Sequence, residues 1–487
     1  MIQDDGIPYF TWADYTEAEM EAIFQKARRN EPVTIHEVDQ YQRTFLYEEG
    51  RIMNQSKPLN GRILVSDVLG RDRFNTQLLY FTCSSLSQDD ERIYLISDRD
   101  GHPNVWMHDM FHGTDRQLTD NQKGILKSYV YFDGTQNEGF GKASVCLDYI
   151  RERIYYIQDD KICSSDREGN IRVLNRIPDG RMTAFTHVSL DGTKLCVPMT
   201  DGRILDFDPD TEGYGLDKRP KYNIDQRAQD ENLNSYLCVY DTESGALLYE
   251  KMIPRCWITH VQFHPLDSDI IMYNHEWSAF DCGIRRVNIY DRHQDIFYHV
   301  RTEGDGTKGN PRGYVRSRHD WVCHEMWTDD GRSIIYHGGY DDGPAMVGRC
   351  DIDFTHTDAD GLPVRNFWEI ALPDEYNAYG HFLMDHRGNL TCDGYYRMPG
   401  EKIIERENST DNGPDPHRKD GAYITKVEPD WDEGILHWVP LCKHDSDWLG
   451  QDAHPHPIYA HAGDRIFFNS RMAHTVNVYA VSARTPQ

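Results

Sequence analysis

The stretch from Ser87 to Asp109, SQDDERIYLISDRDGHPNVWMHD, carries the pattern on which the fold prediction rests. A polar, acid-rich turn precedes a short apolar strand, and a second turn then leads into a second strand. The same order recurs in segments that begin near Asp148, Ser189, His264, Thr328, Met384 and His461. Self-similarity at a period of tens of residues, with several strands per unit, is typical of a β-propeller. Seven copies predict seven blades.

The spacing of these copies is irregular, at roughly 40 to 75 residues against about 40 to 50 for a plain blade. Several blades must therefore carry insertions. Polar stretches rich in Asp and Gly are the expected places, at Asp208–Asn232, Thr302–Arg318 and Pro399–Gly421. We expect them to be loops over one face, either as walls of a substrate cleft or as plain surface excursions.

The N-terminal region lacks the repeat. Residues Thr16–Asn30 have apolar positions near helical spacing, with acids early and basic residues late, which predicts one helix. We expect residues 1–70 to form an extension that packs on the propeller or supplies a closing strand, and residues 71–487 to form one catalytic domain. The predicted fold class is all-β: a seven-bladed β-propeller with a short N-terminal helical segment and several loop insertions.

Composition narrows the classes of partner. The 487-residue chain has a net charge of -28, which repels nucleic acid and anionic membranes, so neither is an expected partner. Its 11 cysteines include no C-x-x-C pair, which favours reduced thiols over a disulfide framework. No run has the length of a signal-peptide core or a membrane span. We expect a soluble, cytoplasmic protein.

Several motifs are absent or weak. There is no phosphate-binding glycine loop and no G-x-S-x-G, which argues against a nucleotide enzyme or a serine hydrolase. The acidic turns Asp98–Gly101 and Asp329–Gly331 lack the spacing of a calcium loop. Hairpin turn chemistry is the better interpretation of both.

The stretch Gln451–Pro457, QDAHPHP, holds two histidines one residue apart. On an extended backbone, His454 and His456 would point to the same side. Gln451 can add an oxygen, and a third histidine from elsewhere would complete a nitrogen and oxygen site suited to a divalent metal such as Mn²⁺. With 23 histidines in the chain, the H-x-H alone is a weak signal.

Histidines also stand just before the turns of three other copies. The innermost strand of each propeller blade lines the central channel, and that strand should precede each turn. The four places are His260, His324, His381 and the 451–456 set. Taken singly, each histidine fits a hydrogen-bonded structural role, but together they predict a histidine-lined pocket.

From Trp257 onward the chain resembles the oligogalacturonate lyases, polysaccharide lyase family 22. The motifs that carry the resemblance follow in order: WITHVQFHP (257–265), NHEWSAFDCGIRR (274–286), CHEMW (323–327), GHFLMDHRG (380–388), KHDSDW (443–448) and GQDAHPHP (450–457). Members of that family are seven-bladed propellers with a metal at the channel mouth, which agrees with the seven repeats in this sequence.

This resemblance implies a role for individual residues. The Mn²⁺ ligands would be His381, Gln451, His454 and His456. His324 would be the catalytic base. Arg285 would bind substrate, with His260 and His275 beside it, and His444 would have a supporting role. A structural ion pair is the alternative for Arg285.

The activity implied is cleavage of short oligogalacturonides, as in pectin degradation, by β-elimination to a 4,5-unsaturated or 5-keto-4-deoxyuronate product. The metal would neutralise the uronate carboxylate while neutral imidazole removes the C5 proton. Two alternatives stay open: a lyase of the same architecture on another uronate oligosaccharide, and a non-catalytic propeller that binds protein partners. The oligomeric state is not predicted.

The first half departs from the family pattern. The family's histidine-containing segment before the first blade would fall near Asn75–Leu78, where no histidine stands. The N-terminal region and the insertions also lengthen the chain. These departures leave the length and identity of the substrate open.

Overall fold

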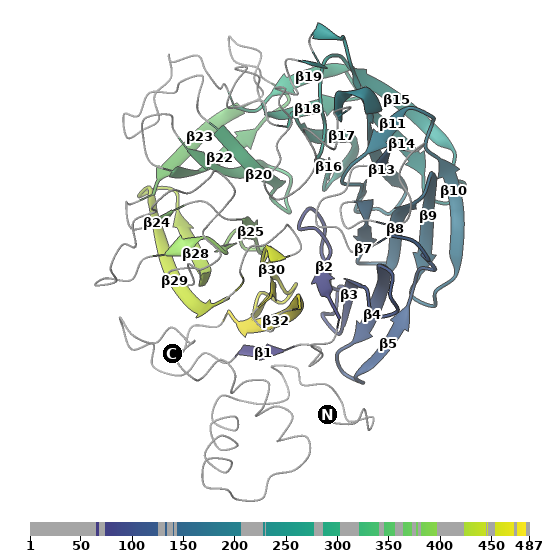
Figure 1. The fold of residues 1–487 in the computed structure, drawn as a ribbon. Coiled ribbons are helices and arrows are strands. Elements are labelled where there is room, and N and C mark those ends of the chain that lie inside the picture. The colour runs from purple at the N-terminus through teal and green to yellow at the C-terminus, as the bar shows by residue number, and fades with distance from the viewer. Residues whose placement is uncertain are drawn as a thin grey trace, which may run out of the picture.

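The computed structural model describes residues 65–67, 74–124, 132–133, 140, 144–205, 227–228, 230–276, 286–301, 321–339, 345–355, 364–372, 376–377, 381–396, 423–444, 446, 453–471 and 475–483. Within these ranges the chain is almost wholly β. Its larger sheets, each of four or more strands, stand around a central axis as the blades of a propeller (Figure 1). There are seven of them, as the repeats predict.

The first four blades follow the chain from the innermost strand outward, except where blade three gains extra strands. Blade one holds β2 (Thr76–Leu78), β3 (Arg92–Ser97), β4 (Asn104–Asp109) and β5 (Thr114–Gln117). Blade two holds β7 (Cys146–Asp148), β8 (Arg153–Gln158), β9 (Lys161–Asp166) and β10 (Ile171–Arg176). Blade three holds β6 (Phe132–Asp133), β11 (Arg181–Thr183), β12 (His187–Val188), β13 (Lys194–Asp201), β14 (Ser235–Asp241) and β15 (Leu247–Ile253). Blade four holds β16 (Val261–His264), β17 (Asp267–Asn274), β18 (Val287–Asp291) and β19 (Ile296–His299).

The last three blades complete the ring. Blade five holds β20 (Trp321–Trp327), β21 (Ser333–Gly339), β22 (Ala345–Ile352) and β23 (Val364–Ala371). Blade six holds β25 (Phe382–Met384), β26 (Leu390–Cys392), β28 (Tyr423–Asp430) and β29 (Ile435–Lys443), with β24 (Tyr376–Asn377) and β27 (Tyr395–Tyr396) forming a separate pair. Blade seven holds β30 (Ile458–Tyr459), β31 (Arg465–Ser470) and β32 (Asn477–Ser482), with β1 (Val65–Asp67) as its outermost strand.

The ring is closed by strands from the two ends of the described chain. β1 runs antiparallel to β32, with Val65 opposite Val481 and Asp67 opposite Tyr479. This is the closing strand that the sequence offered as one role for the N-terminal region. It covers what would otherwise be an exposed strand edge. The predicted helix at Thr16–Asn30 lies outside the described residues.

The turns that open three of the repeats share one hydrogen bond. Ser87, Ser189 and Thr328 each donate from the hydroxyl to the aspartate two residues later, over 2.6, 2.6 and 2.7 Å. Gly192 and Gly331 then take positive φ angles of 71° and 66°, where glycine has no Cβ to clash. The acidic residues at Asp329–Gly331 therefore serve a hairpin turn, as predicted.

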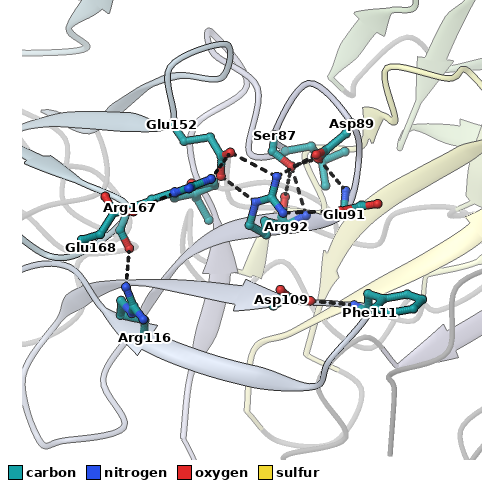
Figure 2. Close-up of polar contacts among 12 residues, drawn as sticks. Ser87, Asp89, Glu91, Arg92, Asp109, Phe111, Arg116, Glu152, Arg167 and Glu168 are labelled. Carbon is teal, nitrogen blue, oxygen red and sulfur yellow. Dashed lines mark hydrogen bonds and ion pairs between the residues drawn. The ribbon is translucent and has the colours of Figure 1, made fainter.

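Blades one and two are joined by a network of charged side chains (Figure 2). Arg92 of β3 donates to both carboxylate oxygens of Glu152, at 2.6 and 3.1 Å, and to Asp89 at 2.7 Å. Arg167 adds a contact to Glu152 at 3.4 Å. Burial alone would lower the pKa of Arg92, but the carboxylate of Glu152 outweighs it and raises that pKa. The guanidinium stays charged and ties the two blades together.

Two of the predicted insertions interrupt blades. β13 pairs directly with β14, and β26 with β28, although long segments separate them in the sequence. The third falls between β19 of blade four and β20 of blade five. Residues 206–226, 302–320 and 397–422 themselves lie outside the described ranges.

The described cysteines, ten in number, are all free thiols. This agrees with the prediction of reduced cysteines. Among the described residues, none of the helices combines the length and the hydrophobicity that a bilayer crossing requires.

Candidate metal centre and active site

Four successive blades bring histidines to the inner end of the propeller. His260 directly precedes β16, and His324 lies within β20. His381 directly precedes β25, and His454 and His456 precede β30. The sequence placed these residues before the turns of their repeats, and the structure confirms that each stands at the innermost strand.

Three of these histidines meet at one point. The Nε2 atoms of His381 and His456 lie 3.0 Å apart, and the ring centroids of His454 lie 5.3 and 5.6 Å from those of His381 and His456. One nitrogen from each ring falls within 4.8 Å of the others. The H-x-H pair and the third histidine that it needed are thus brought together from blades six and seven.

The fully buried carboxylate of Asp393 orients this trio. It accepts the Nδ1–H of His381 at 2.8 Å, and it accepts the backbone N–H groups of His381 and His456 at 2.6 and 3.0 Å. Burial alone would raise the pKa of Asp393, but the charge and hydrogen bonds of His381 outweigh it and lower that pKa. His444 supports the same residue, with Nε2 3.2 Å from the Asp393 carbonyl oxygen.

The donor set fits a divalent metal. Because Asp393 only accepts, Nδ1 of His381 carries the proton and Nε2 keeps its lone pair, facing the Nε2 of His456. A carboxylate behind a histidine ligand is the usual arrangement at metal sites. Gln451, the predicted oxygen ligand, lies outside the described residues.

The extended backbone that we predicted for the H-x-H pair is wrong. We expected His454 and His456 on an extended strand, but His456 has a φ of 42°, in the left-handed region. The hydrogen bond from its N–H to Asp393 accompanies this conformation. The rings converge through a local twist of the chain, which stores strain at the site.

His324 stands beside the trio, with its ring centroid 4.6 Å from that of His381. It occupies a β-bulge of β20, where the register shifts between Cys323 and Met326, and its φ is 52°. Its Nδ1 lies 2.6 Å from Nε2 of His337 on β21. Burial, and next the charge of His381, hold the pKa of His324 well below its usual value. The imidazole is therefore neutral and able to accept a proton.

Buried charges lie next to His324. Arg286 pairs with Glu276 at 3.1 Å and with Glu325 at 3.5 Å, and Glu325 in turn contacts Nδ1 of His260 at 3.2 Å. Burial alone would raise the pKa of Glu325, but Arg286 and His260 outweigh it and lower that pKa to about 2. His260 is thus held by an internal carboxylate.

The structure says less about the other residues that were predicted to bind substrate. Arg285 lies outside the described residues, and its neighbour Arg286 is buried. His275 is also buried, and its backbone N–H donates to the Arg286 carbonyl at 2.8 Å.

Two aromatic residues form the floor of the site. The segment after β2 reaches from blade one to the centre of the ring (Figure 1). There the ring of Tyr80 lies 5.1 Å from that of His456, and Phe81 lies 4.9 Å from His324. Tyr80 stacks on Phe185 at 3.8 Å. Just before this floor, Asn75 donates to Asp98 at 2.8 Å, so the segment that lacks the family's histidine makes structural bonds in blade one.

Sequence reasoning missed Asp393, His337, Tyr80 and Phe81. The pairing register of two hairpins would have pointed to Asp393 and His337. Phe382 pairs with Cys392, which sets His381 and Asp393 side by side at the end of the hairpin, and Cys323 pairs with His337 directly. No such rule points to Tyr80 and Phe81, because they come from a loop far away in the sequence.

Two outer features stand apart from this centre. Asp267, Asp269 and His293 also lie close enough to share an ion, but Lys194 and Arg292 each bind Asp269 at 2.8 Å and already neutralise it. A shallow hollow near Arg349 and Trp431 lies against β22 and the β28–β29 turn. Neither contains any of the central histidines.

No family model matches the chain, and no curated protein matches its sequence. The solved structures that are similar over most of the chain include two oligogalacturonate lyases. An oligogalacturonate lyase in complex with manganese has a TM-score of 0.62 at 16% identity, covering 86% of this chain and 93% of that one. An oligogalacturonate lyase from Vibrio parahaemolyticus has a TM-score of 0.59 at 16% identity, covering 87% and 94%. At this identity the likeness shows the propeller fold.

Proposed function

We propose that this protein is a metal-dependent lyase that cleaves short oligogalacturonides by β-elimination. The observation that carries the proposal is the meeting of His381, His454 and His456, oriented by Asp393, beside the strained base candidate His324. The fold likeness to two oligogalacturonate lyases supports it.

The reaction sets a clear chemical demand. Cleaving the bond to O4 of a uronate requires loss of the C5 proton, which is weakly acidic because the adjacent carboxylate resists further negative charge. His381, His454, His456 and Gln451 would hold a divalent cation such as Mn²⁺, which would supply positive charge next to this carboxylate. By accepting the Nδ1–H of His381, Asp393 orients the ring and leaves Nε2 as the nitrogen that faces the site.

His324 removes the C5 proton. Its Nδ1 is engaged by His337, so Nε2 is the atom that accepts the proton. The ring of Phe81 packs edge-on against the imidazole, with the ring centroids 4.9 Å apart. Arg285 binds a substrate carboxylate through paired hydrogen bonds, which supplies the local attraction that the net charge of -28 does not.

The product is a 4,5-unsaturated uronate, or the 5-keto-4-deoxyuronate that it becomes. The free thiols support the expectation of a reducing, cytoplasmic compartment.

A variant of the base tests the mechanism. His324→Ala should keep its manganese content and lose the rise in ultraviolet absorbance from the unsaturated product, because only the base is removed. His293→Ala, an exposed histidine bound to Asp267, is the matched control and should keep both. Undiminished activity in His324→Ala would remove that residue from the role.

A second substrate class is favoured by one observation. Asn75–Leu78 carries no histidine, and within blade one the side chains of Asn75 and Thr76 bond to Asp98 at 2.8 Å and to Ser97 at 2.9 Å. A lyase for another uronate oligosaccharide would use the same metal and base with different cleft contacts. The two proposals are separated by a panel of galacturonides, glucuronan fragments and sulfated uronides, with cleavage followed by absorbance. The class of uronide that is cleaved fastest is the substrate class of the enzyme.

A further inference from the structure

A second cluster of metal-binding groups lies in blade five beside the proposed centre. Sγ of Cys323 is 3.1 Å from Nε2 of His337 and 3.6 Å from Nδ1 of His324, and the two nitrogens are 2.6 Å apart. The three residues share one small volume, with each ligand atom within 4.8 Å of the others. A thiol and two imidazoles form a soft donor set, unlike the all-nitrogen trio of blades six and seven.

The backbone is shaped to make this cluster. Consecutive residues of a regular strand point to opposite faces, so Cys323 and His324 should not both reach the same atom. The bulge between Cys323 and Met326, with the left-handed φ of 52° at His324, turns both side chains toward His337. A strained conformation that gathers three metal-binding groups is a built feature of the blade.

We propose that Cys323, His324 and His337 bind a thiophilic divalent cation, with Zn²⁺ as the best fit, and that this binding inhibits the enzyme. Thiolate with imidazole is the donor set that Zn²⁺ prefers, whereas Mn²⁺ prefers harder ligands. Tetrahedral Zn²⁺ with Zn–N bonds of about 2.0–2.1 Å holds its nitrogens roughly 3.3 Å apart. The two nitrogens, now 2.6 Å apart, must therefore separate by about 0.7 Å to admit the ion, and a water completes the coordination.

The site is reachable and its charge is compatible. His337 is buried at 1% exposure, while Cys323 and His324 are only partly buried, so an ion can enter from their side. The positive charge of Arg286 is offset by its ion pairs with Glu276 and Glu325.

Inhibition follows from the chemistry of one imidazole and rests on the proposed function. Without the cation, the proton on Nδ1 of His324 faces His337 and Nε2 has the lone pair that accepts the C5 proton. When Zn²⁺ takes Nδ1, that proton moves to Nε2 and the ring can no longer act as a base. The thiol of Cys323 gives its proton to solvent as the thiolate binds, so one proton is released per ion.

Cobalt titration of the full-length protein tests the site without relying on activity. A Co²⁺–thiolate bond produces a near-ultraviolet charge-transfer absorption that the His381, His454 and His456 trio cannot produce. We expect this absorption in the wild type, its loss in Cys323→Ser, and its retention in Cys163→Ser, a thiol buried in β9 of blade two. A wild type without the absorption, or a Cys323→Ser variant that keeps it, would overturn the proposal. Cys323→Ala serves in the same way if the serine variant does not fold.

Zinc inhibition tests the consequence. In the presence of Mn²⁺, the zinc concentration that halves activity should rise at least about tenfold in Cys323→Ser, since even the loss of an outer contact costs about 10–100-fold in metal affinity. Each variant is compared with its own zinc-free rate. Equal zinc sensitivity in both proteins would refute the inhibitory role. If no uronide is cleaved, the proposed function fails, while the cobalt spectrum still decides the metal site.

Discussion

At the scale of single residues, Asp393 does more for the site than its place in the sequence suggests. One carboxylate orients the ring of His381 and binds the backbone of His456, so it links the histidines of two blades. The ligands can face a common point only if this carboxylate is present and ionised.

Replacing Asp393 by Asn should therefore weaken manganese binding by about 10–100-fold, because the amide no longer fixes the tautomer of His381. The affinity is measured by manganese titration of metal-stripped protein. Asp385→Asn is the control, since Asp385 serves the turn after β25 by accepting the N–H of Asn389 at 2.8 Å. If both variants bind manganese as the wild type does, Asp393 has no role in orienting the ligands.

The repeat predicted that histidines from four blades line one pocket, because each precedes a turn and the inner strands of a propeller share one axis, and the resemblance then singled out His381, His454 and His456 as ligands. It could not predict their partners. Tyr80 and Phe81 reach His456 and His324 from another blade, and nothing in the local pattern encodes that approach. The strained backbone at His456 and His324 was also hidden, because positive φ angles there depend on contacts distant in sequence.

At the scale of strands and blades, the loss in the free energy of unfolding on breaking an ion pair should depend on how deeply the two charged side chains are buried. Arg301, two residues after β19 of blade four, and Glu369 of blade five are both 0% exposed and joined at 2.7 Å, whereas Arg92 and Glu152 are 16% and 12% exposed. Arg301→Met should lower the free energy of unfolding by about 3–5 kcal/mol, because Glu369 stays buried without its charge partner. Arg92→Met should cost about 1 kcal/mol, since water can solvate Glu152. Chemical denaturation measures both, and equal losses would contradict this assignment.

A histidine between blades three and four predicts acid sensitivity. Nδ1 of His187 accepts the N–H of Phe263 at 3.2 Å, which requires a neutral ring, and burial lowers the pKa of His187 to about 4. The unfolded chain, with a histidine pKa of about 6.5, binds this proton first as the pH falls. The contribution of His187 to the free energy of unfolding is therefore constant above about pH 6.5. Below that pH it lowers the free energy of unfolding progressively, down to about pH 4.

Thermal unfolding at pH 7.5, 6 and 5 measures the effect. The melting temperature should fall less steeply with acid in His187→Gln than in the wild type, because the amide can accept the same hydrogen bond without titrating. The two proteins showing the same slope would exclude His187 as a source of the acid sensitivity.

The repeat could be recognised in the sequence because several blades use similar turn chemistry. Ser189 and Thr328 show it in their matching hydroxyl–aspartate bonds, followed by a glycine with positive φ. Strand bounds were harder to predict where blades differ. Blade three gathers the extra strands β6 and β11, which pair with each other although they are far apart in the sequence.

At the scale of the whole molecule, the ring explains why a site can be built from residues so far apart. Blade number followed from counting repeats, and closure followed from the need to cover a strand edge, met by β1 against β32. The aromatic floor comes from blade one and the metal trio from blades six and seven, which are neighbours only because the ring closes. The propeller therefore provides the rigid frame, and the inner strand ends provide the chemistry.

The central claim is that the histidine trio binds a divalent metal that serves uronate β-elimination. The most direct measurement is the ultraviolet absorbance trace on trigalacturonate as Mn²⁺ is returned to chelator-stripped protein, for wild type and His454→Ala. The account predicts no activity in the stripped protein, recovery that saturates near one Mn²⁺ per chain in the wild type, and no recovery at that level in His454→Ala. Activity in the stripped protein, or the same Mn²⁺ requirement in both proteins, would contradict it.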